Sequence, residues 1–209
     1  MLSGIDWVPF LLTSVVLGFI PGPDILLAVG RSITSGRQTG VSIALGSLPG
    51  LTVHTVAAAL GLSAILMTSA TAFTVVKYLG AAYLIYLGLR ELFSRSKLSA
   101  SQGASPASLR QSFWQGFITS VFNPKTAIFF LALLPQFVRA DSGNIVLEFI
   151  VLGLLFNVIT LIPILGYVYL AAAFSGWLRR NPTFLRYQQV VTGTLFIGLG
   201  LRLALDRRG

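Results

Sequence analysis

Long runs of apolar residues constrain the fold of this chain more than any other feature of its sequence. Runs of roughly 18 or more mostly apolar residues are long enough to cross a bilayer as helices. The sequence contains six: 7–29, 41–67, 71–93, 113–138, 145–174 and 184–205. With 55% hydrophobic residues, 10% charged residues and a mean hydropathy of +0.82, little remains for a soluble domain. We therefore predict one all-α integral membrane domain over residues 1–209, with six transmembrane helices.

The first apolar run is interrupted by the segment Pro21-Gly22-Pro23-Asp24. The two prolines remove two backbone donors and, with the glycine, lower helix propensity, so we expect the helix to break and restart here. An acidic side chain inside a hydrocarbon span costs roughly 2.5 to 3.5 kcal/mol on insertion scales. Asp24 therefore indicates a functional site or a buried partner.

A second break is predicted at Asn123-Pro124-Lys125, in the fourth apolar run. The segment Gly-Phe-Ile shortly precedes both breaks, at residues 18–20 and 116–118. A Ser-rich cytoplasmic linker, about 94–112, separates repeat one (about 1–93) from repeat two (about 113–209). Three spans per repeat invert the second copy in the membrane. Inverted repeats with broken helices one and four are typical of transporters, whose sites lie at the breaks.

The restarted helices offer a site for an anion. Asn123 is a good N-cap, and Pro23 and Pro124 suit the first helical position, whereas Gly22 is the weaker cap. Free backbone N–H groups and the helix dipole would favour a substrate carboxylate at each restart. The dipole also favours Asp24 but opposes Lys125, which therefore needs another reason to be there.

Two interpretations of the paired charges stay open. Asp24 and Lys125 form an ion pair that holds the breaks together, or Lys125 binds a substrate carboxylate while Asp24 receives an ammonium group or a proton. His54, the one histidine, is either a proton carrier or a hydrogen-bonded structural residue. Asn157 either lines the same cavity or only joins helices.

Basic residues sort by loop and predict the orientation of the chain. Nine fall in segments 30–40, 90–112 and 175–186, and five lie at the opposite ends of the spans. By the positive-inside rule, the first group faces the cytoplasm and both termini lie outside. The net charge of +9 is spread over helix ends, which argues against a nucleic-acid surface. Cysteine is absent, and one histidine with two methionines suits no metal site, so we expect no cofactor.

At these residues the sequence resembles the LysE/RhtB family of amino-acid exporters, and within it the homoserine, homoserine-lactone and threonine exporters. The resemblance covers nearly the whole chain and rests on the order and spacing of short motifs. These are Pro21-Gly22-Pro23, Gly46 and Gly50 with His54, Lys77 through Gly88, Asn123-Pro124-Lys125, Leu134-Pro135-Gln136-Phe137, Gly166-Tyr167 and Gly193. The resemblance implies a multi-pass protein of the bacterial inner membrane that exports small amino acids, with the proton gradient as the usual source of energy.

The leading hypothesis is thus a secondary exporter of threonine, homoserine or a related zwitterion. Two alternatives are a passive channel for small polar solutes and an exporter of a non-amino-acid solute. A third, an intramembrane enzyme, lacks a second deep carboxylate and an H-E-x-x-H motif. Glycine-rich faces, including the pairs Gly36/Gly40 and Gly46/Gly50, would pack helices within one chain or between two copies in a homodimer. The predicted substrate-binding residues are Pro21, Gly22, Pro23, Asp24, Asn123, Pro124, Lys125 and Asn157, and those predicted for proton coupling are Asp24 and His54.

Overall fold

The computed structural model of the chain describes residues 4–62, 70–93, 108–139, 144–173 and 182–205. Nearly all of this part of the chain is helical, and its only β-structure is one antiparallel bridge between Ile5 and Val138. The longer helices are α1 (Trp7–Phe19), α2 (Pro23–Ser35), α3 (Arg37–Ala57), α5 (Ala70–Phe93), α6 (Leu109–Val121), α8 (Ile145–Ala173) and α10 (Pro182–Leu205). The shorter ones are η1 (Ala58–Leu62), α7 (Pro124–Ile128), η2 (Phe129–Leu133) and η3 (Leu134–Phe137).

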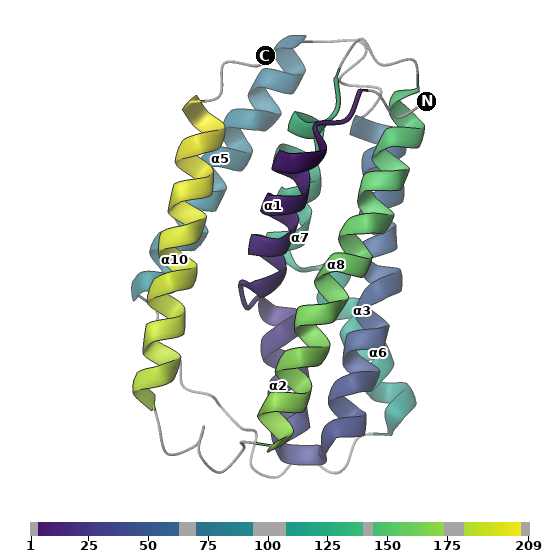
Figure 1. Cartoon of the computed structure of the whole chain (residues 1–209), viewed down its shortest axis with the longest axis vertical. Coiled ribbons are helices and arrows are strands. Elements are labelled where there is room, and N and C mark those ends of the chain that lie inside the picture. The colour runs from purple at the N-terminus through teal and green to yellow at the C-terminus, as the bar shows by residue number, and fades with distance from the viewer. Residues whose placement is uncertain (1–3, 63–69, 94–107, 140–143, 174–181, 206–209) are drawn as a thin grey trace.

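Two helices are broken where the sequence predicts. The α1 helix stops at Phe19, and α2 restarts at Pro23 after an extended Ile20 and Gly22. The α6 helix stops at Val121, and α7 restarts at Pro124 and continues through η2 and η3. The stretch Pro124–Phe137 is bent by 42° from α6. Figure 1 shows both broken helices running along the long axis, with α1 above α2 and α7 above the lower part of α6.

Several of the expected membrane spans can be recognised in the described residues, and the count of six stays a prediction. In the described residues, three helical stretches are long and apolar enough to cross a membrane: Trp7–Ser35, Arg37–Gly61 and Ile145–Ala173. A fourth is added when the bent pair Leu109–Val121 and Pro124–Phe137 is counted as one span. The remaining long helices, α5 and α10, have 24 residues each. Within the described residues, α10 contributes the shorter apolar stretch Gly193–Leu205.

Glycines set the contact between α3 and α6. A Cβ on Gly46 would collide with the backbone of Phe113, and one on Gly116 would collide with the backbone of Ile43. A Cβ on Gly50 would lie 2.7 Å from Cβ of Ser120. The two helices therefore touch backbone to backbone, as small residues allow in membrane proteins.

The pair Gly36/Gly40 does not act as a packing motif. Gly40 does lie against α2 and α8, where a Cβ would come within 2.9 Å of the Ala28 carbonyl oxygen and of Val168. Gly36 instead forms the turn between α2 and α3, with a φ of 94°, and a Cβ there would meet no atom within 4 Å. Its backbone conformation, which disfavours other residues, accounts for the glycine.

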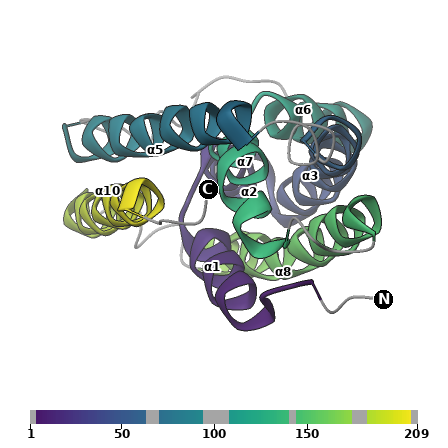
Figure 2. The ribbon, with the colours of Figure 1, turned by 90° about the horizontal axis from the view of Figure 1, so that it is seen from above.

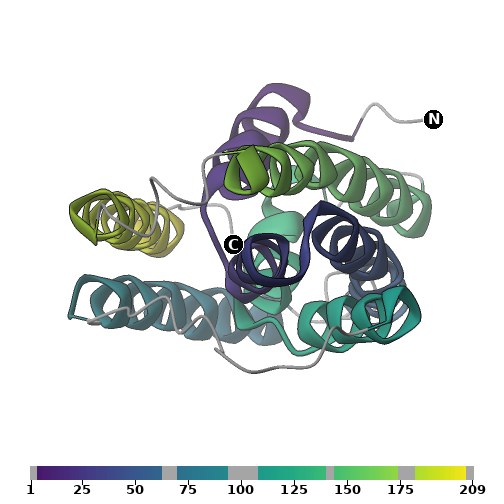
Figure 3. The same cartoon turned by 90° about the horizontal axis from the view of Figure 1, so that it is seen from below.

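The α5 and α10 helices form an antiparallel pair beside the other helices. Gly88 packs against Gly193, and Gly200 lies against the Ala81 carbonyl oxygen. Views along the long axis show this pair at one side and the broken helices, α3 and α8 at the other (Figures 2 and 3). The α5 helix is tied to the rest through Gly80, which touches Ala132 of η2.

The core joins the second break to the surrounding helices. Phe129 of η2 stacks on Phe156 of α8 with a centroid distance of 3.9 Å, and Phe130 meets the same ring edge to face. A second, smaller cluster of buried residues, including Ile25, Ile43 and Val168, joins α2, α3 and α8. Most of the predicted linker 94–112 lies outside the described residues, and α6 already begins at Leu109.

Candidate functional site

The two breaks meet through Lys125. Its Nζ donates hydrogen bonds to the carbonyl oxygens of Ile20 at 2.8 Å and of Leu17 at 3.3 Å, at the C-terminal end of α1. The last carbonyls of a helix lack partners within the helix and carry the negative end of its dipole. Lys125 is only 8% exposed. The carbonyls at the end of α1 therefore stabilise its positive charge inside the apolar span, which the dipole of its own helix disfavours.

Asp24 lies in the first turn of α2, close to Lys125 around Gly22. A Cβ on Gly22 would be 2.8 Å from Asp24 Oδ1 and 3.2 Å from Lys125 Nζ. Asp24 is 4% exposed, and its Oδ1 has no hydrogen-bond partner among the described residues. Gly22 thus provides the space in which both charged groups approach one break.

The Asn123 side chain caps the restarted helix, as predicted. Its Oδ1 accepts a hydrogen bond of 3.0 Å from the Lys125 backbone N–H, while Gly22 supplies no side-chain cap to α2. Asn123 is fully buried, and its Nδ2 finds no partner in the described chain. The cap therefore holds the backbone of Lys125 in place and leaves one amide donor beside the break.

A small cavity lies between the charged residues and α8. Its volume is about 10 Å³, close to the minimum that admits one water molecule. Of the predicted site residues, Asp24 and Lys125 line it. The other lining residues are Gly18, Ile25, Leu51, Thr126, Phe156, Thr160 and Ile164. This conformation has no room for an amino acid between the breaks.

The three prolines of the breaks shape the backbone instead of lining the cavity. Pro23 and Pro124 occupy the first positions of α2 and α7, where a missing N–H costs nothing. The Pro23 side chain is exposed, and Pro124 is half-buried. Pro21 lies in the non-helical link between α1 and α2.

His54 and Asn157 lie beside the second break and on its neighbouring helices. His54 Nε2 is 3.2 Å from the carbonyl oxygen of Ser120, in the last turn of α6, and its ring stacks on Phe130. Asn157 Nδ2 donates a hydrogen bond of 3.4 Å to Thr52 Oγ1 on α3, and Asn157 Oδ1 is unpaired within the described residues. Both side chains connect helices near the site without lining the small cavity.

Two polar residues of α8, Tyr167 near the first break and Glu148 near the start of the helix, went unrecognised as structural partners in the sequence. The Tyr167 hydroxyl donates a hydrogen bond of 2.9 Å to the Phe19 carbonyl oxygen, so α8 braces the end of α1. Glu148, 1% exposed in α8, accepts a bond of 3.3 Å from the Gly4 N–H, and its Oε2 has no partner in the described chain. A lone acid in an otherwise apolar helix was the available signal for Glu148.

Apolar helices, two breaks with buried charges and a cavity between them define the class of a multi-pass membrane protein built for transport. The LysE type translocator family model matches residues 15–207. The chain belongs to this family, which places it as a multi-pass protein of the bacterial cytoplasmic membrane with a role in efflux.

Relatives match along nearly the whole chain. An uncharacterized membrane protein of Bacillus subtilis, YrhP, is 34% identical over 92% of this chain and 95% of its own length. A homoserine/homoserine lactone efflux protein of Salmonella typhimurium is 29% identical over 96% of this chain and 97% of its own. An uncharacterized membrane protein of Vibrio cholerae is 31% identical over 95% of this chain and 96% of its own length. No solved structure matches the chain significantly.

Proposed function

We propose that this protein is a secondary active exporter of small amino acids, such as threonine, homoserine or a related zwitterion, driven by proton antiport. The observation that carries the proposal is the meeting of Asp24 and Lys125 at the two breaks. An amino acid carries the complementary pair of charges. The Salmonella relative named for homoserine efflux supports this class of substrate.

Each charged group has a defined task in this proposal. Lys125 exchanges a carbonyl of α1 for the carboxylate of the substrate, which is a stronger acceptor for its ammonium group. Asp24 receives the substrate ammonium at Oδ1, the oxygen that lacks a partner in the described chain. The amide donor of Asn123 lies at the same break and adds a neutral hydrogen bond to the carboxylate.

Antiport follows from competition at Asp24. The carboxylate holds either the ammonium group of the substrate or a proton, so a cycle that releases the substrate outside returns with the proton. His54, half-buried beside the second break, passes protons between Asp24 and the aqueous side in this scheme.

Substrate entry requires the breaks to separate. A cavity of about 10 Å³ holds no amino acid, so the described conformation is closed around the site. We propose that the chain crosses the membrane six times as two inverted repeats, with α5 and α10 as the third and sixth spans. Movement of one repeat against the other then opens the site to each side in turn.

The test is counterflow in liposomes that contain the purified protein. Labelled threonine, homoserine and a panel of other amino acids are followed with and without an imposed pH gradient. The proposal predicts saturable counterflow of one class of amino acid, accelerated by the gradient. Flux without saturation would instead indicate a channel, and no flux for any member, in folded protein, would indicate another solute.

Variants of the two charged residues sharpen this test. Lys125→Met keeps the length of the side chain but removes its charge, and Asp24→Asn keeps the shape of the carboxylate. We expect Lys125→Met to abolish counterflow and Asp24→Asn to lose substrate affinity or acceleration by the gradient. The matched control is Gly30→Ala on α2, because a Cβ there meets no atom within 4 Å. Normal transport by Lys125→Met would remove Lys125 from the mechanism.

A further inference from the structure

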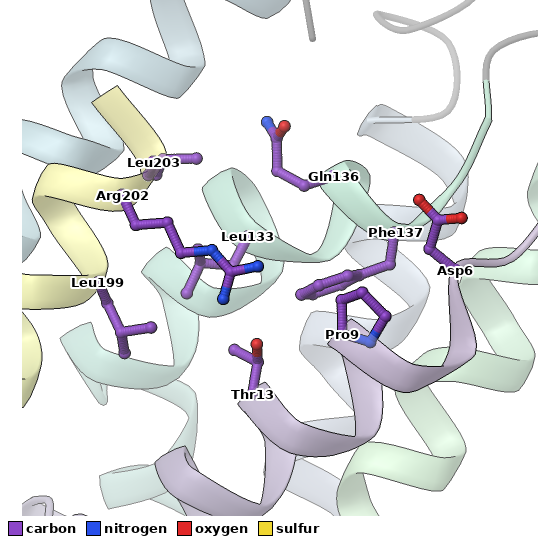
Figure 4. A pocket seen from close by; sticks show the side chains of 9 residues that line it. All are labelled: Asp6, Pro9, Thr13, Leu133, Gln136, Phe137, Leu199, Arg202 and Leu203. Atoms are coloured by element: carbon purple, nitrogen blue, oxygen red, sulfur yellow. The ribbon is translucent and has the colours of Figure 1, made fainter. Parts of the chain in front are cut away.

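A second and much larger cavity is lined by residues of α1, the segment η2–η3 and α10 (Figure 4). Figure 1 shows that α1 begins and α10 ends at the same end of the molecule. The volume of the cavity is about 260 Å³, slightly below the roughly 300 to 1,000 Å³ of pockets for drug-sized ligands. The lining residues are Asp6, Pro9, Thr13, Leu133, Gln136, Phe137, Leu199, Arg202 and Leu203. A cavity of this size suits a small solute.

The packing of the helices explains why this space is open. The α10 helix is held against α5 by the contact of Gly88 with Gly193, and α5 is held against η2 by Gly80. The α1 helix is held on its other side by α8, where Gly18 faces Thr160 and Pro163. Helices α1 and α10 are thus fixed by different neighbours, and the cavity separates them.

Polar groups of distinct kinds face this cavity. The Arg202 side chain extends from α10 across the cavity toward Leu133 and Thr13, and Gln136 of η3 lines the cavity at its upper edge (Figure 4). Both amide atoms of Gln136 are buried and have no hydrogen-bond partner within the described chain. Buried amides of this kind usually bind a protein group or an ordered water, so both atoms are available to a bound solute. Asp6 lies at the opposite rim from Arg202, at the start of α1 (Figure 4).

We propose that this cavity is a second binding site, which holds the exported amino acid before its release. Arg202 binds the carboxylate, since a guanidinium presents a fork of donors that matches it. Gln136 supplies neutral hydrogen bonds, Asp6 provides negative charge on the side of the ammonium group, and Pro9, Phe137 and Leu199 contact the short side chain. This inference rests on the proposed function, because it assigns the same class of substrate.

The position of the cavity along α1 fits a site reached after the breaks. Thr13 lies four residues before Leu17, whose carbonyl oxygen binds Lys125, and this corresponds to about 6 Å along the helix axis. Leu133 likewise lies in η2, which continues from the helix that holds Lys125. The same two broken elements therefore line both cavities, and a solute leaving the breaks toward this end passes into the larger one.

The absence of cysteine from the chain allows a direct test by labelling. Leu199→Cys places one thiol on the cavity wall, and a charged, water-soluble thiol reagent is applied to the purified variant in lipid nanodiscs. The rate of labelling is measured with each amino acid of the transport panel. The control thiol is Gln38→Cys, exposed at the other end of the molecule. Each measurement is repeated with Arg202→Gln, and with Arg90→Gln as the matched loss of an arginine outside the cavity.

We expect the amino acid that the unmodified protein transports to slow labelling of Leu199→Cys roughly tenfold, and to leave Gln38→Cys unaffected. Arg202→Gln should remove this protection, and Arg90→Gln should preserve it. A thiol that the reagent never reaches, labelling that is insensitive to transported solutes, or protection that survives Arg202→Gln would each overturn the inference. Protection by an amino acid that the unmodified protein fails to transport would keep the second site and reject the proposed export.

Discussion

Lys125 illustrates how a charged residue is stabilised inside an apolar span. A lysine at the start of a helix is opposed by the dipole of that helix. The carbonyls at the end of α1 supply the opposite field, and the carbonyl oxygens of Leu17 and Ile20 accept hydrogen bonds from Lys125 Nζ. The ammonium group at the second break thereby binds the end of the helix at the first break. A single side chain thus connects the two breaks.

Gly22 is the residue that allows the two charged groups to share this gap. We predict that Gly22→Ala lowers the rate of transport about tenfold or more, because its Cβ would lie 2.8 Å from Asp24 Oδ1 and 3.1 Å from Lys125 Cε. Initial rates of counterflow and thermal unfolding in detergent measure the effect. Gly30→Ala, on the same helix but in open space, should transport normally and be more stable by about 0.5 to 1 kcal/mol. Equal behaviour of the two variants would contradict the role of Gly22.

Asn123 and Ser108 provide a matched pair of N-caps. Asn123 caps α7 at the break, and Ser108 caps α6 through a bond of 3.2 Å from the Gln111 N–H at the exposed end. Each substitution by alanine should lower the free energy of unfolding by about 1 kcal/mol. Only Asn123→Ala should also weaken substrate binding, because its cap positions Lys125. Equilibrium unfolding and the half-saturating concentration in counterflow separate these effects, and an equal loss of affinity in Ser108→Ala would contradict the prediction.

At the scale of elements, the sequence predicted the breaks better than the spans. Proline, glycine and a capping asparagine act locally, so the interruptions at Pro21-Gly22 and Asn123 appear where expected. The ends of α2 and α3 were less predictable, since α2 runs to Ser35 and α3 begins at Arg37 with one turn glycine between them. Polar residues such as Ser35 and Arg37 extend helices beyond the apolar runs by which spans are recognised.

The glycines of α3 and α6 define a contact that tolerates no added side chain. We predict that Gly116→Ala destabilises the protein by about 1 to 3 kcal/mol or more, because its Cβ would overlap the backbone of Ile43, which cannot move independently of α3. Gly198→Ala on α10 is the control, since a Cβ there meets nothing within 4 Å. Thermal unfolding followed by size-exclusion chromatography measures both. A Gly116→Ala protein as stable as the control would show that the two helices pack less closely.

At the scale of the whole molecule, most contacts between residues far apart in the chain could not be predicted from the sequence. That Asp24 and Lys125 line one cavity was an exception, because both charges stand at breaks of comparable depth. The hydrogen bond from Tyr167 to Phe19 joins residues 148 positions apart, and nothing in either local pattern selects the other. The larger cavity also depends on how the helices pack in the folded chain, because α1 and α10 each pack against a different neighbour.

The distribution of basic residues predicts how the molecule lies in the membrane. Arg31, Arg37 and Arg110 are at the end where α2 meets α3 and α6 begins, whereas Arg139 and Arg202 are at the opposite end. Basic residues are retained on the cytoplasmic side, so the first group should face the cytoplasm. We predict that an impermeant thiol reagent added to intact cells labels Arg139→Cys and spares Gln38→Cys, and that inside-out vesicles give the reverse. Labelling of Gln38→Cys in intact cells would invert the orientation, and the larger cavity would then open to the cytoplasm and serve as an entrance for the substrate.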